Sequence, residues 1–308
     1  MAIKTFELEM NHSISLRKTF DIEIPALEWI PLSENFYKTL YIINNKKIEI
    51  KLTKKQNSSL LFSWKNQTEN MNNKIISNIT STFAFFMDKI DVGTNPILLA
   101  LQKYYSDVCY MKATPFNSLL VTILSQNKTG EATRRAFSNL LYVLQQLSPE
   151  GILRTKKIAL ENAIRIAGPY KVKYLIKSSE QILSYWGGNI SQVVELPTDQ
   201  ALSSLIKLPG VSYKTAACVL VFSALKKDIV PIDTHLLRVT QRLGLINIKN
   251  KSLTSSTYMQ INTCLKSKIP DAGYAHLLFV MLGRDYCYAR NPVCNNCPLL
   301  NICPRINI

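Results

Sequence analysis

The stretch that decides the fold lies at residues 208–217 and reads Leu208-Pro209-Gly210-Val211-Ser212-Tyr213-Lys214-Thr215-Ala216-Ala217. A helix is expected to end near Lys207, and a second helix, rich in Ala and Val, to follow the Pro-Gly turn. Two helices joined by so tight a turn leave unpaired backbone N–H groups at the start of the second helix. Those groups, together with the helix dipole, suit a phosphate oxygen. Taken alone, such a junction is more often a plain turn.

The chain that follows this hairpin carries a second informative segment, Asp228-Ile229-Val230-Pro231-Ile232-Asp233-Thr234-His235. Pro231 interrupts the chain, and Asp233 stands just before a new helix. An aspartate at that position is an ordinary N-cap. It is also well placed to face Lys214, nineteen residues earlier, across the returning helix.

Residues 208–238 resemble the helix–hairpin–helix and the Gly/Pro-rich loop with aspartate of the endonuclease III superfamily of DNA glycosylases. The family pattern is L-P-G-V-G-x-K-T-A followed by V-D-T-H; here Ser212 replaces the second hairpin glycine and Ile232 replaces the valine. The resemblance makes Lys214 and Asp233 the catalytic lysine and aspartate. It also implies that the hairpin contacts DNA through Leu208, Gly210, Val211 and Ser212.

The resemblance extends over about residues 95–308. Residues 115–127 resemble the family helix whose end inserts a polar wedge into the duplex, which implies that Gln126 and Asn127 contact DNA. Residues 166–173, Ile166-Ala167-Gly168-Pro169-Tyr170-Lys171-Val172-Lys173, resemble another family segment. Residues 83–88, 95–96 and 105–111 resemble the entry to the helical body in 8-oxoguanine and 3-methyladenine glycosylases, which carry an antiparallel β domain in front.

Four of the seven cysteines crowd into the last 22 residues, at Cys287, Cys294, Cys297 and Cys303. Four thiolates suit either Zn²⁺ or a [4Fe–4S] cluster. The usual zinc framework has two separated C-x-x-C pairs, whereas only one such pair is present. The 6-2-5 spacing resembles the iron–sulfur loop of endonuclease III-like enzymes, which implies a [4Fe–4S] cluster and no nucleotide cofactor. Arg290, inside the first loop, either reaches a DNA phosphate or is a solvated charge.

The predicted fold class is α+β and mainly α: an antiparallel β domain precedes a two-lobed helical body with the hairpin and the iron–sulfur loop. Residues 40–52 predict a β-hairpin around an Asn44-Asn45 turn. The polar, asparagine-rich segment 65–78 predicts a loop or linker. The expected divisions are a β-rich domain at 1–88, a connecting helix at 89–112 that packs with the C-terminal lobe, a helical domain at 113–232 and a C-terminal lobe at 233–308.

The composition of the chain restricts the kind of binding partner and the cellular compartment that we expect. The chain has 37 Lys and Arg against 21 Asp and Glu, a formal net charge of +16. Such a surplus favours a polyanionic partner such as nucleic acid or an acidic membrane, although a generally basic surface is the plainer explanation. No apolar stretch is long enough to predict a membrane span, and the N-terminus lacks a signal-peptide pattern. We expect a monomeric protein inside the cell, in the cytoplasm or nucleoid, bound to double-stranded DNA with a damaged base or an abasic site.

These features predict a bifunctional base-excision DNA glycosylase and AP lyase. Lys214 attacks C1′ of the sugar as a neutral amine, with a pKa lowered by cationic neighbours at a helix N-terminus, and β-elimination follows from the Schiff base. Asp233 stabilises the developing positive charge or assists proton transfer. A glycosylase without lyase activity and a non-catalytic DNA-binding protein are the alternatives; the presence of both residues argues against them.

The lesion is the least determined feature. Residues 271–276 resemble a helix that lines the base pocket of 8-oxoguanine glycosylases, where a glutamine at the position of His276 and an aromatic residue at the position of Val280 contact the base. Endonuclease III-like enzymes tend to have histidine at the position of His276, which either bonds a base edge or is a satisfied core histidine. The β domain points to purine lesions, 8-oxoguanine or an alkylpurine; the cluster and His276 point to oxidised bases, pyrimidines first.

Overall fold

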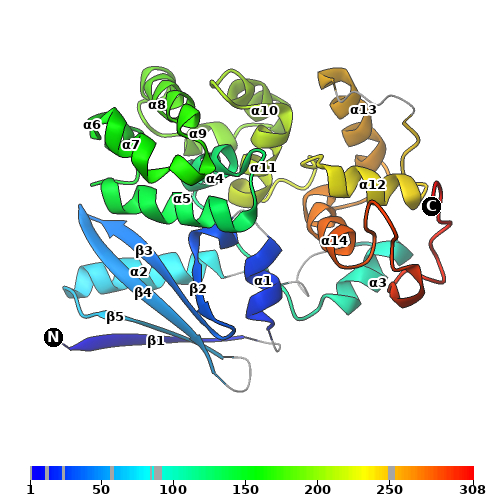
Figure 1. Cartoon of the computed structure of the whole chain (residues 1–308), viewed down its shortest axis with the longest axis horizontal. Helices are drawn as coiled ribbons and strands as arrows, with labels where there is room; N and C mark the ends of the chain where they lie inside the picture. The colour runs from blue at the N-terminus through cyan, green and yellow to red at the C-terminus, as the bar shows by residue number, and fades with distance from the viewer. Residues whose placement is uncertain are drawn as a thin grey trace.

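The computed structural model describes residues 2–10, 14–22, 25–55, 59–83, 85–86, 92–248 and 254–308. The boundary expected at residue 88 lies outside the described residues, as do parts of the 83–88 segment. Figure 1 shows a sheet at one side of the molecule, a group of helices above it and a second helical group that ends in the C-terminal loop.

The first part of the chain forms a five-stranded antiparallel sheet with strand order β1-β5-β4-β3-β2. Its strands are β1 (Ile3–Glu9), β2 (Ile30–Ser33), β3 (Phe36–Ile43), β4 (Lys46–Lys54) and β5 (Ser59–Lys65). The predicted β-hairpin is confirmed as β3 and β4. Asn44 and Asn45 both adopt left-handed φ angles, 50° and 60°, which is the backbone of a type I′ turn and matches the twist of the flanking strands.

The loop predicted at residues 65–78 is wrong, because most of this segment belongs to helix α2 (Glu69–Thr82). Its asparagines suggested a linker, but Met71, Ile75 and Ile79 recur every four residues and are buried. They join the apolar face of the sheet in one core. The polar stretch is also internally bonded, since Asn72 accepts a hydrogen bond from Trp64 Nε1 at 2.9 Å. Burial of one face therefore outweighs the low helix propensity of asparagine.

The rest of the chain is helical. Two short elements, α1 (Leu16–Ile22) and the 3₁₀ helix η1 (Pro25–Glu28), precede β2; β6 (Phe85–Phe86) pairs with β7 (Cys109–Tyr110). The helical body contains α3 (Pro96–Tyr104), α4 (Pro115–Ser125), α5 (Gly130–Val143), α6 (Pro149–Arg154), α7 (Lys157–Ala163), α8 (Val172–Trp186), α9 (Ser191–Val194), α10 (Thr198–Ile206), α11 (Tyr213–Ala224), α12 (Thr234–Arg242), α13 (Ser255–Lys266) and α14 (Ala272–Asp285). Three further 3₁₀ turns are η3 (Arg165–Ala167), η4 (Pro169–Lys171) and η5 (Cys294–Asn296).

Two hydrophobic cores divide the molecule. The smaller core lies between the sheet, α1 and α2, and contains the packed rings of Phe20, Trp29, Phe62 and Phe83. The larger core runs through the whole helical body from Leu98 to Leu299. The buried guanidinium of Arg134 in α5 connects the two parts, since it donates to the Phe20 carbonyl at 2.6 Å.

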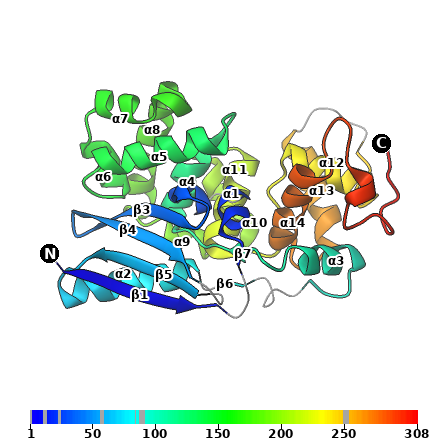
Figure 2. The same cartoon turned by 60° about the horizontal axis from the view of Figure 1, so that its bottom comes forward.

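The helical body has two groups, and α11 and α12 place the catalytic candidates between them. Helices α4 to α11 lie over the sheet, whereas α12, α13, α14 and α3 gather at the other end (Figures 1 and 2). Helix α3 packs on α14, where Tyr105 donates to Asp285 Oδ2 at 3.0 Å. Among the described residues, none of the helices is long and apolar enough to cross a bilayer.

Candidate active site and DNA interface

The hairpin begins where α10 ends and is closed by its glycine. Gly210 has φ 80°, a left-handed conformation, and a Cβ built there would lie 2.6 Å from Cγ of Tyr174 in α8. Only glycine fits both the conformation and the close approach. Ser212 then caps α11, because its Oγ accepts from the Thr215 N–H at 3.4 Å. The serine that replaces the family glycine therefore has a capping role here.

The hairpin's backbone N–H groups have different partners. The Val211 N–H donates to the Leu208 carbonyl at 3.1 Å within the turn, and the side chains of Leu208 and Val211 are buried. Within the described part of the chain, no protein acceptor is recorded for the N–H of Gly210 or Ser212. These two groups lie at the N-terminal end of α11, where the helix dipole is positive. An anion at the hairpin would therefore meet Gly210 and Ser212 rather than Leu208 and Val211.

Lys214 lies in the first turn of α11 and is partly exposed. The side chains around its amine differ from the cationic neighbours that we predicted. Burial is the largest single influence on the pKa of Lys214 and lowers it, as does Arg284. The interaction with Cys218 and the negative charge of Asp233 outweigh both and raise the pKa. The predicted lowering by cationic neighbours is therefore wrong: the closest partners are a thiol and a carboxylate, and only Arg284 among these groups is cationic.

Asp233 serves as the N-cap of α12 and lies within electrostatic range of Lys214. Its Oδ1 accepts from the Leu236 N–H at 2.8 Å. Burial by itself raises the pKa of Asp233, but His276, the Leu236 N–H, Lys214 and His235 together hold it below its usual range. The group is an ionised carboxylate at neutral pH whose second oxygen is not used by the cap. Capping and charge stabilisation are therefore compatible in one side chain.

His276 in α14 is buried beside this pair. Burial lowers the pKa of His276 to about 4, with Asp233, Lys214 and Arg284 within electrostatic reach. Its ring lies edge-on to Phe222, with centroids 6.2 Å apart, and its Nδ1 has no hydrogen-bond partner among the described residues. The ring is thus neutral, with one nitrogen unsatisfied. Val280, one turn along α14, is buried as well.

Gln126 and Asn127 follow α4 and are placed differently from each other. The Gln126 amide donates to the Gly210 carbonyl at 2.9 Å and to Thr215 Oγ1 at 3.2 Å. The Gln126 side chain is therefore bound to the hairpin. Asn127 is exposed and has a left-handed φ of 55°. Of the two residues expected to enter the duplex, Asn127 is the one that the structure leaves at the surface.

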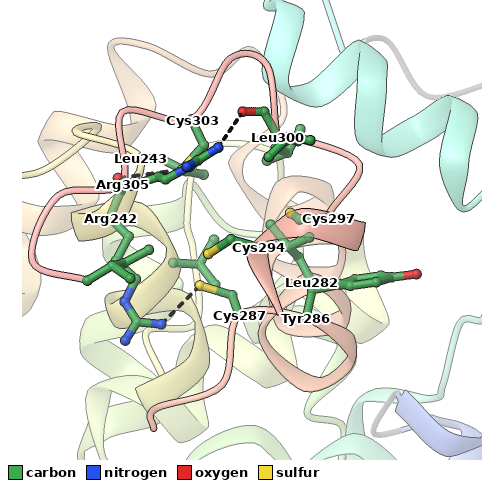
Figure 3. A pocket seen from close by; sticks show the side chains of 13 residues that line it. Arg242, Leu243, Leu282, Tyr286, Cys287, Cys294, Cys297, Leu300, Cys303 and Arg305 are labelled. Atoms are coloured by element: carbon green, nitrogen blue, oxygen red, sulfur yellow. Dashed lines mark hydrogen bonds between the residues drawn. The ribbon is translucent and has the colours of Figure 1, made fainter. Parts of the chain in front are cut away.

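The four C-terminal cysteines line one small cavity of about 30 Å³ between the loop and α12 (Figure 3). Arg242 in α12 donates to Cys287 Sγ at 3.3 Å and to the carbonyl of Tyr288 at 2.6 Å. Arg305 also lines the cavity, and most of the remaining walls are apolar, with Val239, Leu282 and Leu299. Among the described residues, no three Cys, His, Asp or Glu side chains form a group that could hold a metal ion. The four cysteines nevertheless line the same cavity.

Three residues near these sites were not anticipated from the sequence. Cys218 bonds Lys214 from one helical turn away, which the i, i+4 spacing on a helix could have indicated. Arg284 influences the pKa of Lys214, His235 and His276, but nothing local in the sequence marks it. Lys171, with no exposed surface, gave no signal, because lysine is rarely buried. Arg290, which was anticipated, is exposed in the cysteine loop.

The sequence of this chain is similar to those of known DNA repair proteins. Residues 120–262 match the family model described as the HhH-GPD superfamily base excision DNA repair protein. The chain is 30% identical over 198 residues to endonuclease III of Thermotoga maritima, a match that covers 63% of this chain and 84% of that protein. Endonuclease III of Bacillus subtilis is 32% identical over 195 residues, which cover 62% and 81%. The chain belongs to the HhH-GPD superfamily of base excision DNA repair proteins.

The fold of this chain is also similar to that of solved structures, which cover different shares of it. A trapped endonuclease III–DNA covalent intermediate is 26% identical with a TM-score of 0.52 and covers 63% of this chain and 84% of that one. The apo form of a Clostridium acetobutylicum 8-oxoguanine glycosylase/lyase is 17% identical with a TM-score of 0.68 and covers 90% and 95%. This second likeness concerns the fold alone. It covers most of this chain, so the fold described here extends to that protein beyond the helical body alone.

Proposed function

We propose that this protein is a bifunctional DNA glycosylase and AP lyase with Lys214 as its nucleophile. The observation that carries the proposal is the pairing of Lys214 with Asp233 at the N-terminal ends of two consecutive helices. A DNA-binding module needs neither group, whereas covalent base excision needs an amine and a carboxylate beside the same sugar. Membership of a base excision repair superfamily and the likeness to an endonuclease III trapped covalently on DNA support this chemistry.

The reaction begins with binding of the duplex and extrusion of the damaged nucleotide, since a stacked base hides its glycosidic bond. The N–H groups of Gly210 and Ser212 bind a phosphate, and Asn127 fills the space that the nucleotide leaves. The buried Nδ1 of His276, which has no partner among the described residues, is the atom to which we assign a hydrogen bond with the base edge. The formal charge of +16 favours the approach of a polyanion.

The Lys214 amine then forms a bond to C1′ while the glycosidic C1′–N bond breaks and its electron pair leaves with the base, which takes up a proton. The amine must be neutral to attack. Burial and the charge of Arg284 favour that neutral form, whereas Cys218 and Asp233 favour the ammonium. The attack therefore uses the deprotonated fraction of Lys214. Asp233 stabilises the positive charge that develops on the sugar. Ring opening gives the Schiff base, from which loss of a C2′ proton expels the 3′ phosphate.

We also propose that the four cysteines hold a [4Fe–4S] cluster. Support comes from the 6-2-5 spacing of Cys287, Cys294, Cys297 and Cys303, which has one C-x-x-C pair where the usual zinc framework has two. The four thiols line one cavity, and the Arg242 guanidinium is placed to stabilise a thiolate. When bound, the cluster supplies structural support to the loop that carries Arg290.

Borohydride trapping tests the nucleophile. Wild-type protein mixed with a duplex that contains an abasic site should give a covalent complex, and Lys214→Ala should abolish it. Lys207→Ala, an exposed lysine just before the hairpin, is the matched control and should still be trapped. Undiminished trapping of Lys214→Ala would refute the assignment. Base release without trapping by the wild type indicates a glycosylase without lyase activity, and DNA binding without either indicates a binding module.

The substrate that we propose is an oxidised base, with pyrimidine lesions first. Support comes from the endonuclease III relatives and from the neutral His276 at the position where 8-oxoguanine glycosylases have glutamine. Excision should be compared on duplexes with thymine glycol, 5-hydroxycytosine, 8-oxoguanine, uracil and 3-methyladenine. A preference for 8-oxoguanine or an alkylated purine over both oxidised pyrimidines would overturn the substrate and leave the lysine chemistry in place.

A further inference from the structure

Lys171, the last residue of η4, has a fully buried side chain with 0% exposed surface. Its Nζ donates to the carbonyls of Leu124 and Gln126, both at 2.7 Å. These acceptors lie at the C-terminus of α4, where helix carbonyls lack intrahelical partners and the dipole is negative. Burial, with repulsion from Lys128, lowers the pKa of Lys171 to about 8, so the side chain is still mainly an ammonium at neutral pH.

The carbonyl of Gln126 that Lys171 holds is one bond away from the exposed Asn127. The Gln126 amide contacts the hairpin through the Gly210 carbonyl and Thr215 Oγ1, and Thr215 is the residue after Lys214. The ammonium of Lys171 therefore fixes a backbone turn that has Asn127 on one side and the catalytic hairpin on the other.

The helix that follows Lys171 supports the hairpin directly. Ser178 in α8 donates to the Pro209 carbonyl at 2.9 Å, and the side chain of Tyr174 contacts Gly210. The segment η4–α8 thus contacts both loops to which we assign DNA contacts, the turn after α4 and the hairpin before α11. The two loops come from distant parts of the sequence, and this segment contacts both of them.

We propose that Lys171 is a positioning residue for base extrusion: its ammonium sets the position of Asn127 relative to Lys214, so that insertion into the duplex and attack on the sugar occur in one geometry. The inference rests on the proposed function. Lys171 contacts neither substrate nor reacting atoms, since its side chain is fully buried, and it acts through the α4 carbonyls and Gln126.

A purely structural role makes a different prediction. If Lys171 only stabilised the fold, its loss would lower the melting temperature and reduce all activities by one common factor. If it positions Asn127, its loss impairs the step that needs insertion more than the step that does not. Excision of an intact damaged base requires the base to be unstacked, whereas a preformed abasic site has no base to extrude. The ratio of the two activities therefore separates the two roles.

The test compares Lys171→Met, which keeps the apolar stem and removes the ammonium, with Lys177→Met, an exposed lysine of the following helix α8. Single-turnover excision on a lesion duplex and borohydride trapping on an abasic duplex are measured well below the melting temperature of each variant. We expect Lys171→Met to lose about 30-fold in excision (~2 kcal/mol) and less than about threefold in trapping. Lys177→Met should be unchanged in both.

A fluorescent reporter gives an independent readout. With 2-aminopurine beside the lesion, local unstacking on binding should raise the fluorescence for the wild type and Lys177→Met and much less for Lys171→Met. If Lys171→Met does not fold, Lys171→Gln keeps an N–H donor without the charge and should show the same selective loss. Equal losses in excision and trapping, or no loss in either, would overturn the proposal. Failure of the wild type to be trapped would instead count against the proposed function.

Discussion

The side chains of Lys214 and Cys218 are hydrogen-bonded to each other across one turn of α11. Cys218 is fully buried, and burial raises the pKa of its thiol, so at neutral pH it is a neutral acceptor for the lysine ammonium. A hydrogen bond to the charged form of Lys214 favours that form and raises its pKa. The thiol thus opposes the burial that would otherwise release the proton.

Cys218→Ala should therefore lower the pKa of Lys214. Because the neutral amine is the nucleophile, the acid limb of the pH profile for abasic-site trapping should move to lower pH, and trapping near pH 6 should become faster. The truncation also leaves a small cavity, which we expect to cost about 1 kcal/mol of stability. Trapping rates from pH 5 to 9 provide the measurement.

Cys264→Ala serves as the control for this experiment, since Cys264 is a half-buried thiol in α13 whose Sγ contacts the Leu245 carbonyl at 3.4 Å. Its profile should coincide with that of the wild type. An acid limb that stays in place for Cys218→Ala, or moves to higher pH, would contradict the role assigned to the thiol.

Two substitutions at Asp233 separate its two roles, which are to cap α12 and to stabilise positive charge on the sugar. Asn caps helices as well as Asp does, whereas Ala does not. Asp233→Asn should therefore melt close to the wild type and bind DNA, but lose at least about 100-fold in excision, because the charge on the sugar is no longer stabilised. Asp233→Ala should lose the activity and about 1 kcal/mol of stability as well. Excision by Asp233→Asn at the wild-type rate would leave Asp233 as a cap only.

The sequence predicted what local chemistry determines. The Asn44-Asn45 turn was predictable because left-handed asparagines select a tight hairpin. Helix α2 was missed because its asparagines are typical of loops, and the spacing of Met71, Ile75 and Ile79 acquires its meaning only from the sheet that covers them.

At the candidate site the residue types were predictable from a resemblance, but their surroundings were not. The partners of Lys214 are decided by which side chains α11, α12 and α14 bring together. The same holds for Gln126, whose amide is taken by the hairpin, and for Lys171, whose burial contradicts what its residue type favours. Tertiary contacts of this kind have no local pattern in the sequence.

We expect the stability of the folded protein to depend on pH because of the buried carboxyl group of Glu28. It lines a cavity of about 710 Å³ between the sheet and the helical body, and its buried Oε1 has no partner among the described residues. Burial raises the pKa of Glu28 to about 7, although Asn117 donates to its Oε2 at 3.2 Å. The folded state thus holds this proton more tightly than the unfolded state, whose pKa is near 4.5. The contribution of this group to the free energy of unfolding is fully present below pH 4.5 and is lost as the pH rises through 7.

Glu28→Gln should remove that loss, because an amide accepts the same hydrogen bond and does not ionise. The variant should match the wild type near pH 5 and exceed it at pH 8 by on the order of 2 kcal/mol, a few degrees in melting temperature. Melting curves across this range provide the measurement, with Glu34→Gln, an exposed glutamate, as the control. A constant difference between variant and wild type at all pH values would show that Glu28 does not titrate in this window.

Substitution of Arg242 tests whether this side chain stabilises an iron–sulfur cluster in the cysteine loop. Its guanidinium donates to Cys287 Sγ and to the carbonyls of Tyr288 and Ala289, so it neutralises one thiolate and holds the loop that carries it. Thiolate-bound iron–sulfur clusters absorb broadly near ~400 nm, and we expect anaerobically purified wild-type protein to be brown. Arg242→Met should retain less iron and lose the absorbance faster on exposure to air or a chelator, by about tenfold or more. Arg154→Met, an exposed arginine of α6 that does not line the cysteine cavity, should behave like the wild type. A colourless wild-type protein with stoichiometric zinc would overturn the cluster, and an iron content of Arg242→Met equal to that of Arg154→Met would show that the guanidinium does not stabilise it.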